Sequence, residues 1–257
     1  MIESITEYLQ SISEIKAAWL GGSYGRGDQD AFSDYDFFVY SEDAETVFKR
    51  ICTDITKRPD VIFTKTLPFG MTLNSITEDW ERFDISFVDD NALPHHGHNT
   101  SRILFDRGDI ASRMPKEATS TRPDPKAELQ SATREFVRIL GLLIVVAGRE
   151  DYMIAQKGVQ VMKDLLMQIM VLRADKPVRG VPSVRKALLP EDYDFLLNAP
   201  PVAATRESIL ALNAYLAPEF LKHARVLYAE HGLQWPERFV AATLKNVKNK
   251  TGLQIIT

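Results

Sequence analysis

The sequence of 257 residues has little of three things, and each shortage excludes a class of protein. It has one cysteine, Cys52, so no disulfide can form within the chain, which fits a reducing compartment. Its longest apolar run, residues 140–147, is interrupted by Gly141 and is far shorter than the roughly 20 residues that span a bilayer. It has no basic excess, because 31 lysines and arginines stand against 35 acidic residues.

A net charge of −4 disfavours non-specific binding to a phosphate backbone, so we expect no nucleic-acid partner. The first seven residues are acidic and lack the basic-then-apolar pattern of a secretory signal. We therefore expect a cytoplasmic protein with no membrane partner. What the chain does contain, 45% hydrophobic and 26% charged residues, is typical of a globular protein.

The order of predicted elements divides the chain into two halves. Strand-like segments are expected at residues 16–20, 35–40, 61–67, 71–77, 82–88 and 102–106. Helices are expected beside them at 2–14 and at 42–52, the second with Ser41 as a possible cap. Residues 114–125 contain three prolines and no apolar pattern, which indicates a domain junction.

Beyond this junction the pattern is almost wholly helical. Helices are expected at 125–148, 150–174, 205–231 and 236–249, with short pieces around 182–197. Strands grouped first and helices grouped second favour two domains over one alternating sheet. The predicted fold class is α+β, with a mixed-sheet domain at 1–115 and a helical bundle domain at 116–257.

A glycine-rich turn follows the first predicted strand. Residues 21–27 contain four glycines, with Gly22 followed by Ser23, and backbone N–H groups can converge on a phosphate there because little side-chain bulk intervenes. The Ser23 hydroxyl would add a donor, and Arg26 could neutralise a phosphate, although its direction cannot be derived from the sequence. A Gly-Gly-Ser turn alone is common, so the interpretation depends on what lies opposite.

Opposite the turn, two aspartates enter the second predicted strand. Asp34 and Asp36 fall on one face of it, with Cα atoms ~6.7 Å apart, which suits a hard divalent cation such as Mg²⁺. Asp84 lies on the polar face of a later strand, and if that strand is adjacent, three carboxylates converge. Asp89 and Asp90 are competitors for the third position, because they come just after the same strand.

These motifs together resemble the signature of the polymerase-β-like nucleotidyltransferase superfamily: Gly22-Ser23, then Asp34-Tyr35-Asp36, then Asp84 between Phe83 and Ile85. The motif resemblance covers roughly residues 15–90. It implies that Asp34 and Asp36 bind Mg²⁺ and that Ser23 contacts the phosphates. It also implies that Asp84 is a third metal ligand, the general base, or both.

The layout, a small mixed domain followed by a helical one, is similar to that of the lincosamide and aminoglycoside antibiotic nucleotidyltransferases. The resemblance implies transfer of a nucleoside monophosphate, such as AMP from ATP, from a nucleoside triphosphate to a small hydroxylated acceptor, with release of pyrophosphate. It implies an acceptor site in the helical domain and pairing into homodimers. The acidic balance of the chain fits a cationic acceptor without demanding one. Two alternatives stay open, which are modification of a protein target and nucleotide binding without turnover.

Three further groups of charged residues have two interpretations each. Clustered histidines suggest a transition-metal site, but a solvated loop is favoured: His95, His96 and His98. A basic stretch suggests a solvated loop or a contact with triphosphate: Arg173, Lys176, Arg179, Arg185 and Lys186. Acidic residues of the helical half suggest solvated faces or contacts with a cationic acceptor: Glu128, Glu135, Glu150 and Asp151.

Overall fold

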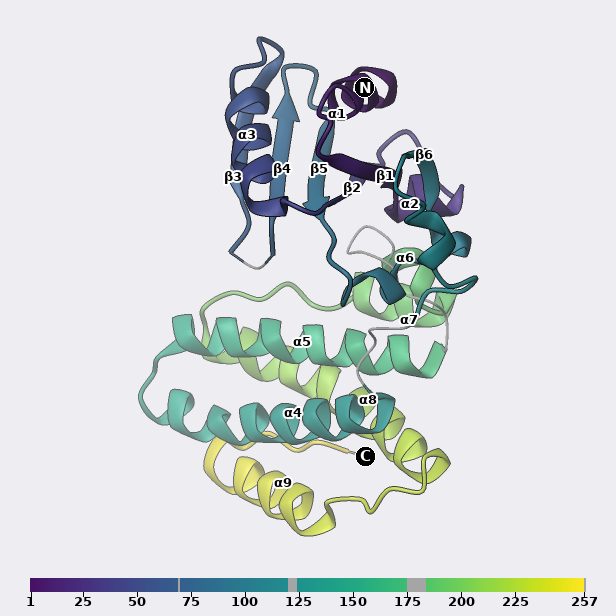
Figure 1. Cartoon of the computed structure of the whole chain (residues 1–257). Coiled ribbons are helices and arrows are strands. Elements are labelled where there is room, and N and C mark those ends of the chain that lie inside the picture. Colours follow the sequence, from purple (N-terminus) through teal and green to yellow (C-terminus); the bar gives the residue numbers. More distant parts are fainter. Residues whose placement is uncertain (69, 120–123, 175–183, 257) are drawn as a thin grey trace. The chain divides into compact units, whose positions relative to one another are not determined.

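The computed structural model describes residues 1–68, 70–119, 124–174 and 184–256. The chain divides into two compact units, Met1–Thr121 and Arg122–Thr257, the first built on a sheet and the second on helices (Figure 1). The predicted α+β class is confirmed. Among the described residues, no helix combines the length and the apolar character that crossing a bilayer requires.

A six-stranded mixed sheet forms the centre of the first unit. Its strands, in spatial order, are β3 (Val61–Thr66), β4 (Thr72–Thr77), β5 (Arg82–Phe87), β2 (Tyr35–Ser41), β1 (Ile15–Leu20) and β6 (Arg102–Asp106). Strands β2 and β5 are parallel, and the other neighbours are antiparallel. The helices of this unit are α1 (Ile2–Gln10), α2 (Gly22–Arg26) and α3 (Ala44–Thr56), with single 3-10 turns at Leu93–His95, His98–Thr100 and Ala111–Arg113.

Alternation along the strands separates a core face from a second face. Phe37 of β2 and Ile85 of β5 are fully buried in the main core, together with residues of α1 and α3 such as Leu9 and Ile51. Because successive side chains of a strand point to opposite faces, Asp36 and Asp84 lie on the second face. On that second face a smaller cluster surrounds Trp19.

Two helix boundaries of the first unit differ from the predicted ones. The helix predicted at 2–14 ends at Gln10. The helix predicted at 42–52 covers Ala44–Thr56, and its cap is Asp43, whose side chain accepts a hydrogen bond from the Thr46 N–H at 3.3 Å. Ser41 is not a cap, because it is the last residue of β2 and its hydroxyl donates to the Glu14 carbonyl.

The second unit is a bundle of helices. They are α4 (Pro125–Gly148), α5 (Tyr152–Ala174), α6 (Val184–Ala187), α7 (Pro190–Leu197), α8 (Arg206–Glu230) and α9 (Glu237–Thr251). Asp124 caps α4 by accepting from the Lys126 N–H, and Pro125 occupies the first turn, so the helix begins at the predicted residue. Helices α4 and α5 lie side by side (Figure 1), and the stacked rings of Phe136 and Phe220 join α4 to α8 at a centroid distance of 3.7 Å.

Candidate active site

The turn after β1 is packed directly against the second strand. The Gly21 N–H donates to the Asp36 carbonyl at 2.9 Å. Gly22 has a φ of +55°, and a Cβ at this position would overlap the Asp36 carboxylate oxygen Oδ2. The positive φ and the closeness of the carboxylate both favour glycine at this position. Because Gly22 has no side chain, the Asp36 carboxylate can lie directly beside the turn.

The glycine-rich turn forms the short helix α2. The Gly25 N–H donates to the Gly21 carbonyl at 2.7 Å, and Ser23 lies half-buried in this single turn. The direction of Arg26 is now visible, since its guanidinium forms an ion pair with Asp28 at 3.1 Å. In this structure Arg26 is thus held by an exposed carboxylate at the end of the turn.

Asp36 and Asp84 are direct neighbours across the parallel pair of β2 and β5. Adjacent strands lie about 4.8 Å apart, so the side chains of Asp36 and Asp84 extend from neighbouring strands on the same face of the sheet. Asn74 of β4 is the register partner of Asp84 on the other side, and its amide Nδ2 donates to Asp84 Oδ1 at 2.6 Å. Asp34 precedes β2 and is partly exposed. Sequence reasoning missed Asn74, because the pairing of β4 with β5 is needed to place it.

The carboxylates raise one another's proton affinity. Burial raises the pKa of Asp36 to about 6, with further contributions from the charges of Asp34 and Asp84, while Arg26 and Arg82 act in the opposite direction. Burial also raises the pKa of Asp84, against the hydrogen bond from Asn74. Local positive charge therefore falls short of what this cluster needs, and a bound cation would favour the ionised forms.

The donor chemistry of the cluster fits a hard cation. Within the described part of the chain, no three histidine, cysteine or acidic side chains form a ready-made metal site. Mg²⁺ is usually held by one or two carboxylates, with waters and substrate phosphates completing its coordination. The carboxyl groups of Asp36 and Asp84, whose pKa values are raised, lie beside the glycine-rich turn, which is compatible with that mode of binding. Asp34, Asp36 and Asp84 remain the predicted ligands.

The two competitors of Asp84 are engaged elsewhere. Asp89 accepts a hydrogen bond from the Ala92 N–H at 2.8 Å. Asp90 accepts from the Tyr40 hydroxyl at 2.6 Å and pairs with Arg113. Both residues follow the C-terminal end of β5, whereas Asp84 lies near its N-terminal end. The register therefore favours Asp84 as the partner of Asp36.

The histidine cluster is not a uniformly solvated loop. His95 and His98 are exposed, but His96 is half-buried, with its ring against Phe38 at a centroid distance of 4.5 Å. The indole Nε1 of Trp19 donates to His96 Nδ1 at 3.4 Å. Burial lowers the pKa of His96 to about 4. The expectation of a solvated loop is wrong for His96, because the loop folds back on the second face of the sheet.

Two arginines of the predicted basic stretch pack within the helical unit. Arg173 of α5 pairs with the buried Asp192 at 2.6 Å, and the guanidinium of Arg185 lies over the Tyr193 ring at 5.2 Å. These two arginines are thus part of helix packing rather than of a solvated loop. Lys176 and Arg179 lie outside the described residues.

Residues 3–77 match the family model described as polymerase beta, nucleotidyltransferase. The matched segment contains Gly22, Ser23, Asp34 and Asp36, and Asp84 lies beyond its end. The predicted resemblance is confirmed, and this part of the chain is a nucleotidyltransferase domain of the polymerase-β type. No curated protein matches the chain in sequence.

Three solved structures are among those similar to this chain. An aminoglycoside 6-adenyltransferase from Bacillus subtilis is 12% identical, with 97% of this chain and 96% of that chain covered and a TM-score of 0.48. A nucleotidyltransferase-like protein from Exiguobacterium sibiricum is 13% identical, with coverages of 97% and 87% and a TM-score of 0.35. The CCA-adding enzyme of Thermotoga maritima, complexed with tRNA, is 12% identical, with coverages of 97% and 66% and a TM-score of 0.33.

Proposed function

We propose that this protein transfers a nucleoside monophosphate, AMP in the first instance, from a nucleoside triphosphate to a hydroxyl group of a small acceptor and releases pyrophosphate. The observation that carries the proposal is the contact of the Gly22 turn with Asp36, whose register partner is Asp84. The proposed phosphate cradle and the acidic pair thereby adjoin, and the segment that matches the nucleotidyltransferase model, residues 3–77, contains the cradle and Asp36.

In the proposed reaction the turn binds the triphosphate. Backbone N–H groups from Gly22 onward and the Ser23 hydroxyl donate to phosphate oxygens, and Arg26 exchanges Asp28 for phosphate. Asp34, Asp36 and Asp84 hold Mg²⁺, which supplies charge neutralisation on the phosphates. Catalysis then consists mainly of positioning and electrostatic stabilisation.

The acceptor hydroxyl attacks the α-phosphorus. A bond forms between that oxygen and phosphorus, the bond between the α-phosphorus and the bridging oxygen breaks, and pyrophosphate leaves. Asp84 is the candidate to accept the hydroxyl proton, because Asn74 occupies one of its oxygens and leaves the other available. Asp84 would serve as metal ligand, general base or both.

We assign acceptor binding to residues 116–257 and propose a lincosamide or aminoglycoside as the acceptor. Three of the four acidic candidates already have partners: Glu128 accepts from Gln168, Glu135 pairs with Arg138, and Asp151 accepts from the Ile154 N–H. Glu150 has no side-chain partner among the described residues and a φ of +54°. Glu150 is therefore the first acidic residue to test against a cationic acceptor.

A panel of aminoglycosides and lincosamides with each of the four nucleoside triphosphates and Mg²⁺ tests the proposal. Pyrophosphate release and a product heavier by one nucleotide are expected with at least one pair. Asp36→Asn should lower the rate at least 100-fold. The control Asp79→Asn alters an exposed turn residue and should leave the rate unchanged. Transfer that persists in Asp36→Asn would overturn the metal assignment.

Two other outcomes correspond to the alternative functions. Label transferred from a triphosphate to a protein of a cell lysate, with no small-molecule product, would favour modification of a protein target. Triphosphate binding without any transfer would favour a regulatory nucleotide-binding protein. Sedimentation of the purified protein would test the proposed homodimer in the same preparation.

A further inference from the structure

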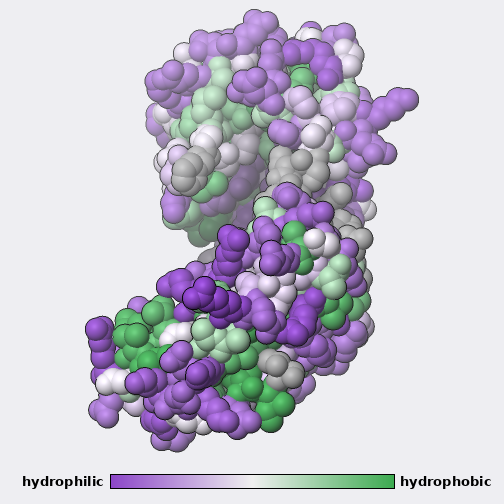
Figure 2. All heavy atoms as spheres, turned by 90° about the horizontal axis from the view of Figure 1, so that it is seen from below, coloured by the Kyte–Doolittle hydropathy of each residue, from purple (hydrophilic) through white to green (hydrophobic). Residues whose placement is uncertain are grey.

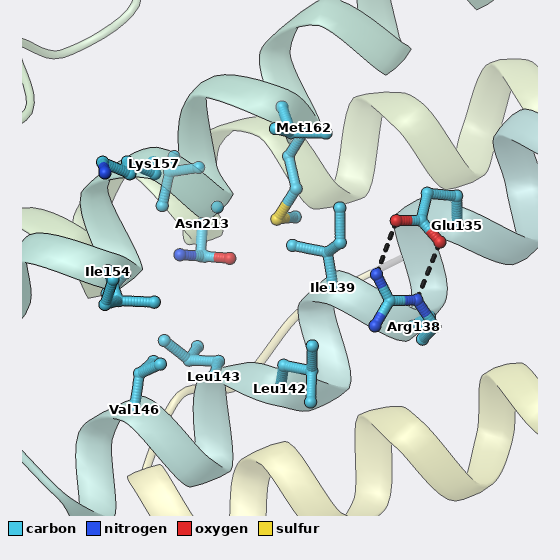
Figure 3. A pocket seen from close by; sticks show the side chains of 14 residues that line it. Glu135, Arg138, Ile139, Leu142, Leu143, Val146, Ile154, Lys157, Met162 and Asn213 are labelled. Atoms are coloured by element: carbon cyan, nitrogen blue, oxygen red, sulfur yellow. Dashed lines mark hydrogen bonds and ion pairs between the residues drawn. The ribbon is translucent and has the colours of Figure 1, made fainter. Parts of the chain in front are cut away.

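A pocket opens between helices α4, α5 and α8 of the helical unit (Figure 3). Its volume is ≈ 300 Å³, which lies at the lower end of the range for small-molecule sites. The lining is mainly aliphatic, including Ile139, Leu143, Val159 and Met162. All lining residues belong to the second unit, so the pocket is independent of the carboxylate cluster of the sheet.

One buried polar side chain interrupts this apolar lining. Asn213 of α8 is 1% exposed, and its Nδ2 donates to the Ile209 carbonyl at 2.8 Å. No group of the described chain donates to its carbonyl oxygen Oδ1. Figure 3 shows the carboxamide between Met162 and Leu143, inside the pocket. This oxygen is not fully enclosed, so solvent reaches it from the pocket. An occupant that displaces this solvent keeps Oδ1 satisfied only if it carries a hydroxyl or N–H group.

A helical glycine keeps part of the pocket open. Gly158 lies within α5 and lines the pocket. A Cβ at this position would meet only Ile139 Cγ2, at an ordinary contact distance of 3.5 Å. Glycine inside a helix costs about 1 kcal/mol relative to alanine. Close packing thus does not require glycine at Gly158, and the absence of a side chain there leaves more room in the pocket.

The rim of the pocket combines apolar and charged side chains. Leu142 and Ile154 are 42% and 51% exposed, and on the face drawn in Figure 2 hydrophobic residues gather in patches among hydrophilic ones. Arg138 at the rim is neutralised by Glu135, with Nε to Oε2 at 2.7 Å. Lys157 also lines the pocket, but it is exposed, so water screens its charge. The entrance therefore suits an uncharged, mostly apolar molecule.

We propose that this pocket binds a small, uncharged, mainly apolar molecule that donates one hydrogen bond to Asn213 Oδ1. The aliphatic walls supply affinity by removing apolar surface from water, and the amide oxygen orients the ligand. The pocket lies in a different unit from the nucleotide site, and the proposal does not depend on the proposed reaction.

Two probes of equal shape test the hydrogen bond in the full-length protein. 2-Naphthol is mainly apolar and carries one hydroxyl donor, whereas 2-methylnaphthalene has a methyl group of similar size in place of that hydroxyl. Titrations followed by methyl NMR should shift the signals of Ile139 and Met162, and 2-naphthol should bind about tenfold more tightly. Shifts confined to other residues, or no binding of either probe, would overturn the proposal.

Matched variants test the location. Gly158→Leu should fill the pocket and weaken 2-naphthol binding at least tenfold. Gly148→Leu adds the same side chain at a helix end where a Cβ meets nothing within 4 Å, and it should bind normally. Asn213→Leu should remove the preference for 2-naphthol while apolar binding persists. If Gly158→Leu fails to fold, Asn213→Leu and the two-probe comparison decide. An unchanged preference for 2-naphthol in Asn213→Leu would overturn the proposal, because the hydroxyl would then have a partner other than Oδ1.

Discussion

Asp36 is a single residue that lowers the stability of the metal-free protein and is at the same time a proposed metal ligand. Its carboxylate is crowded by Asp34 and Asp84, and its pKa is raised to about 6. A raised pKa in an acid means that the ionised form is destabilised by folding, so at neutral pH the metal-free protein loses stability at this residue. The same crowding prepares the cluster for a cation.

The first prediction is that Asp36→Asn stabilises the metal-free protein while abolishing transfer. At pH 7.5 in EDTA, the free energy of unfolding should rise by about 1–3 kcal/mol, because the uncompensated charge is removed. Denaturant unfolding of wild type and variant measures this. With excess Mg²⁺ and triphosphate, the difference in unfolding free energy between variant and wild type should become smaller or change sign. An Asp36→Asn protein less stable than wild type in EDTA would contradict the assigned electrostatics.

The second prediction concerns Asn74, which we interpret as a positioning residue acting through Asp84. Asn74→Leu removes the hydrogen bond to Asp84 Oδ1, which lowers the pKa of that carboxyl against burial. The pKa of Asp84 should therefore rise further in the variant. The acidic limb of the pH–rate profile should therefore move to higher pH, with a decrease in kcat of about tenfold. A uniform loss of rate at all pH values would indicate a structural role only.

At the scale of elements, helix α2 depends on the close approach of its first residue to β2. Gly22 has both a positive φ and a contact with the Asp36 carboxylate, whereas Gly27 has a φ of +75° and open space around it. Comparing substitutions at these two glycines therefore distinguishes the effect of a strained backbone from the effect of steric overlap.

The third prediction compares alanine at these positions. Gly27→Ala should cost about 1 kcal/mol in unfolding free energy, because only the left-handed backbone is strained. Gly22→Ala should cost about 2–4 kcal/mol, because the Asp36 carboxylate or α2 itself must also move. Thermal unfolding of both variants measures the difference. Equal costs would mean that the overlap at Gly22 is relieved without displacing α2.

On the scale of the whole molecule, each unit contains a histidine that resists protonation. His96 lies on the sheet, and burial lowers its pKa to about 4. His223 of the helical unit is 3% exposed, and burial and then Arg173 lower its pKa, against Glu219 and Asp192, while Lys222 adds to the lowering. Both histidines therefore fold in the neutral form.

The fourth prediction is that acidification destabilises both units. Below pH 6.5 the unfolded histidines bind protons that the folded ones do not, so stability present above that pH is lost as the pH falls, toward pH 4 in the case of His96. Unfolding free energies measured from pH 7.5 to 5 should fall less steeply in His96→Gln and His223→Gln than in wild type. Parallel slopes in variants and wild type would exclude the histidines as the cause.

Local pattern was sufficient for much of the fold. Asp124-Pro125 marks the start of α4, and the alternation around Phe37 and Ile85 identifies buried strands, because capping and strand periodicity act over a few residues. Near Ser41 the same reasoning placed a cap two residues early. Ser, Thr, Asn and Asp cap almost equally well, and only the end of β2 decides that Asp43 is used.

The sequence by itself determined the chemistry of the candidate site, since Gly22, Ser23, Asp34 and Asp36 lie within about fifteen residues of one another. Tertiary structure decided the rest. The parallel register of β2 and β5 makes Asp84 the neighbour of Asp36, and β4 brings Asn74 to Asp84. Packing of α4, α5 and α8 places Asn213 in an apolar pocket. These pairings are set by burial and hydrogen bonding between distant segments, which no local pattern encodes.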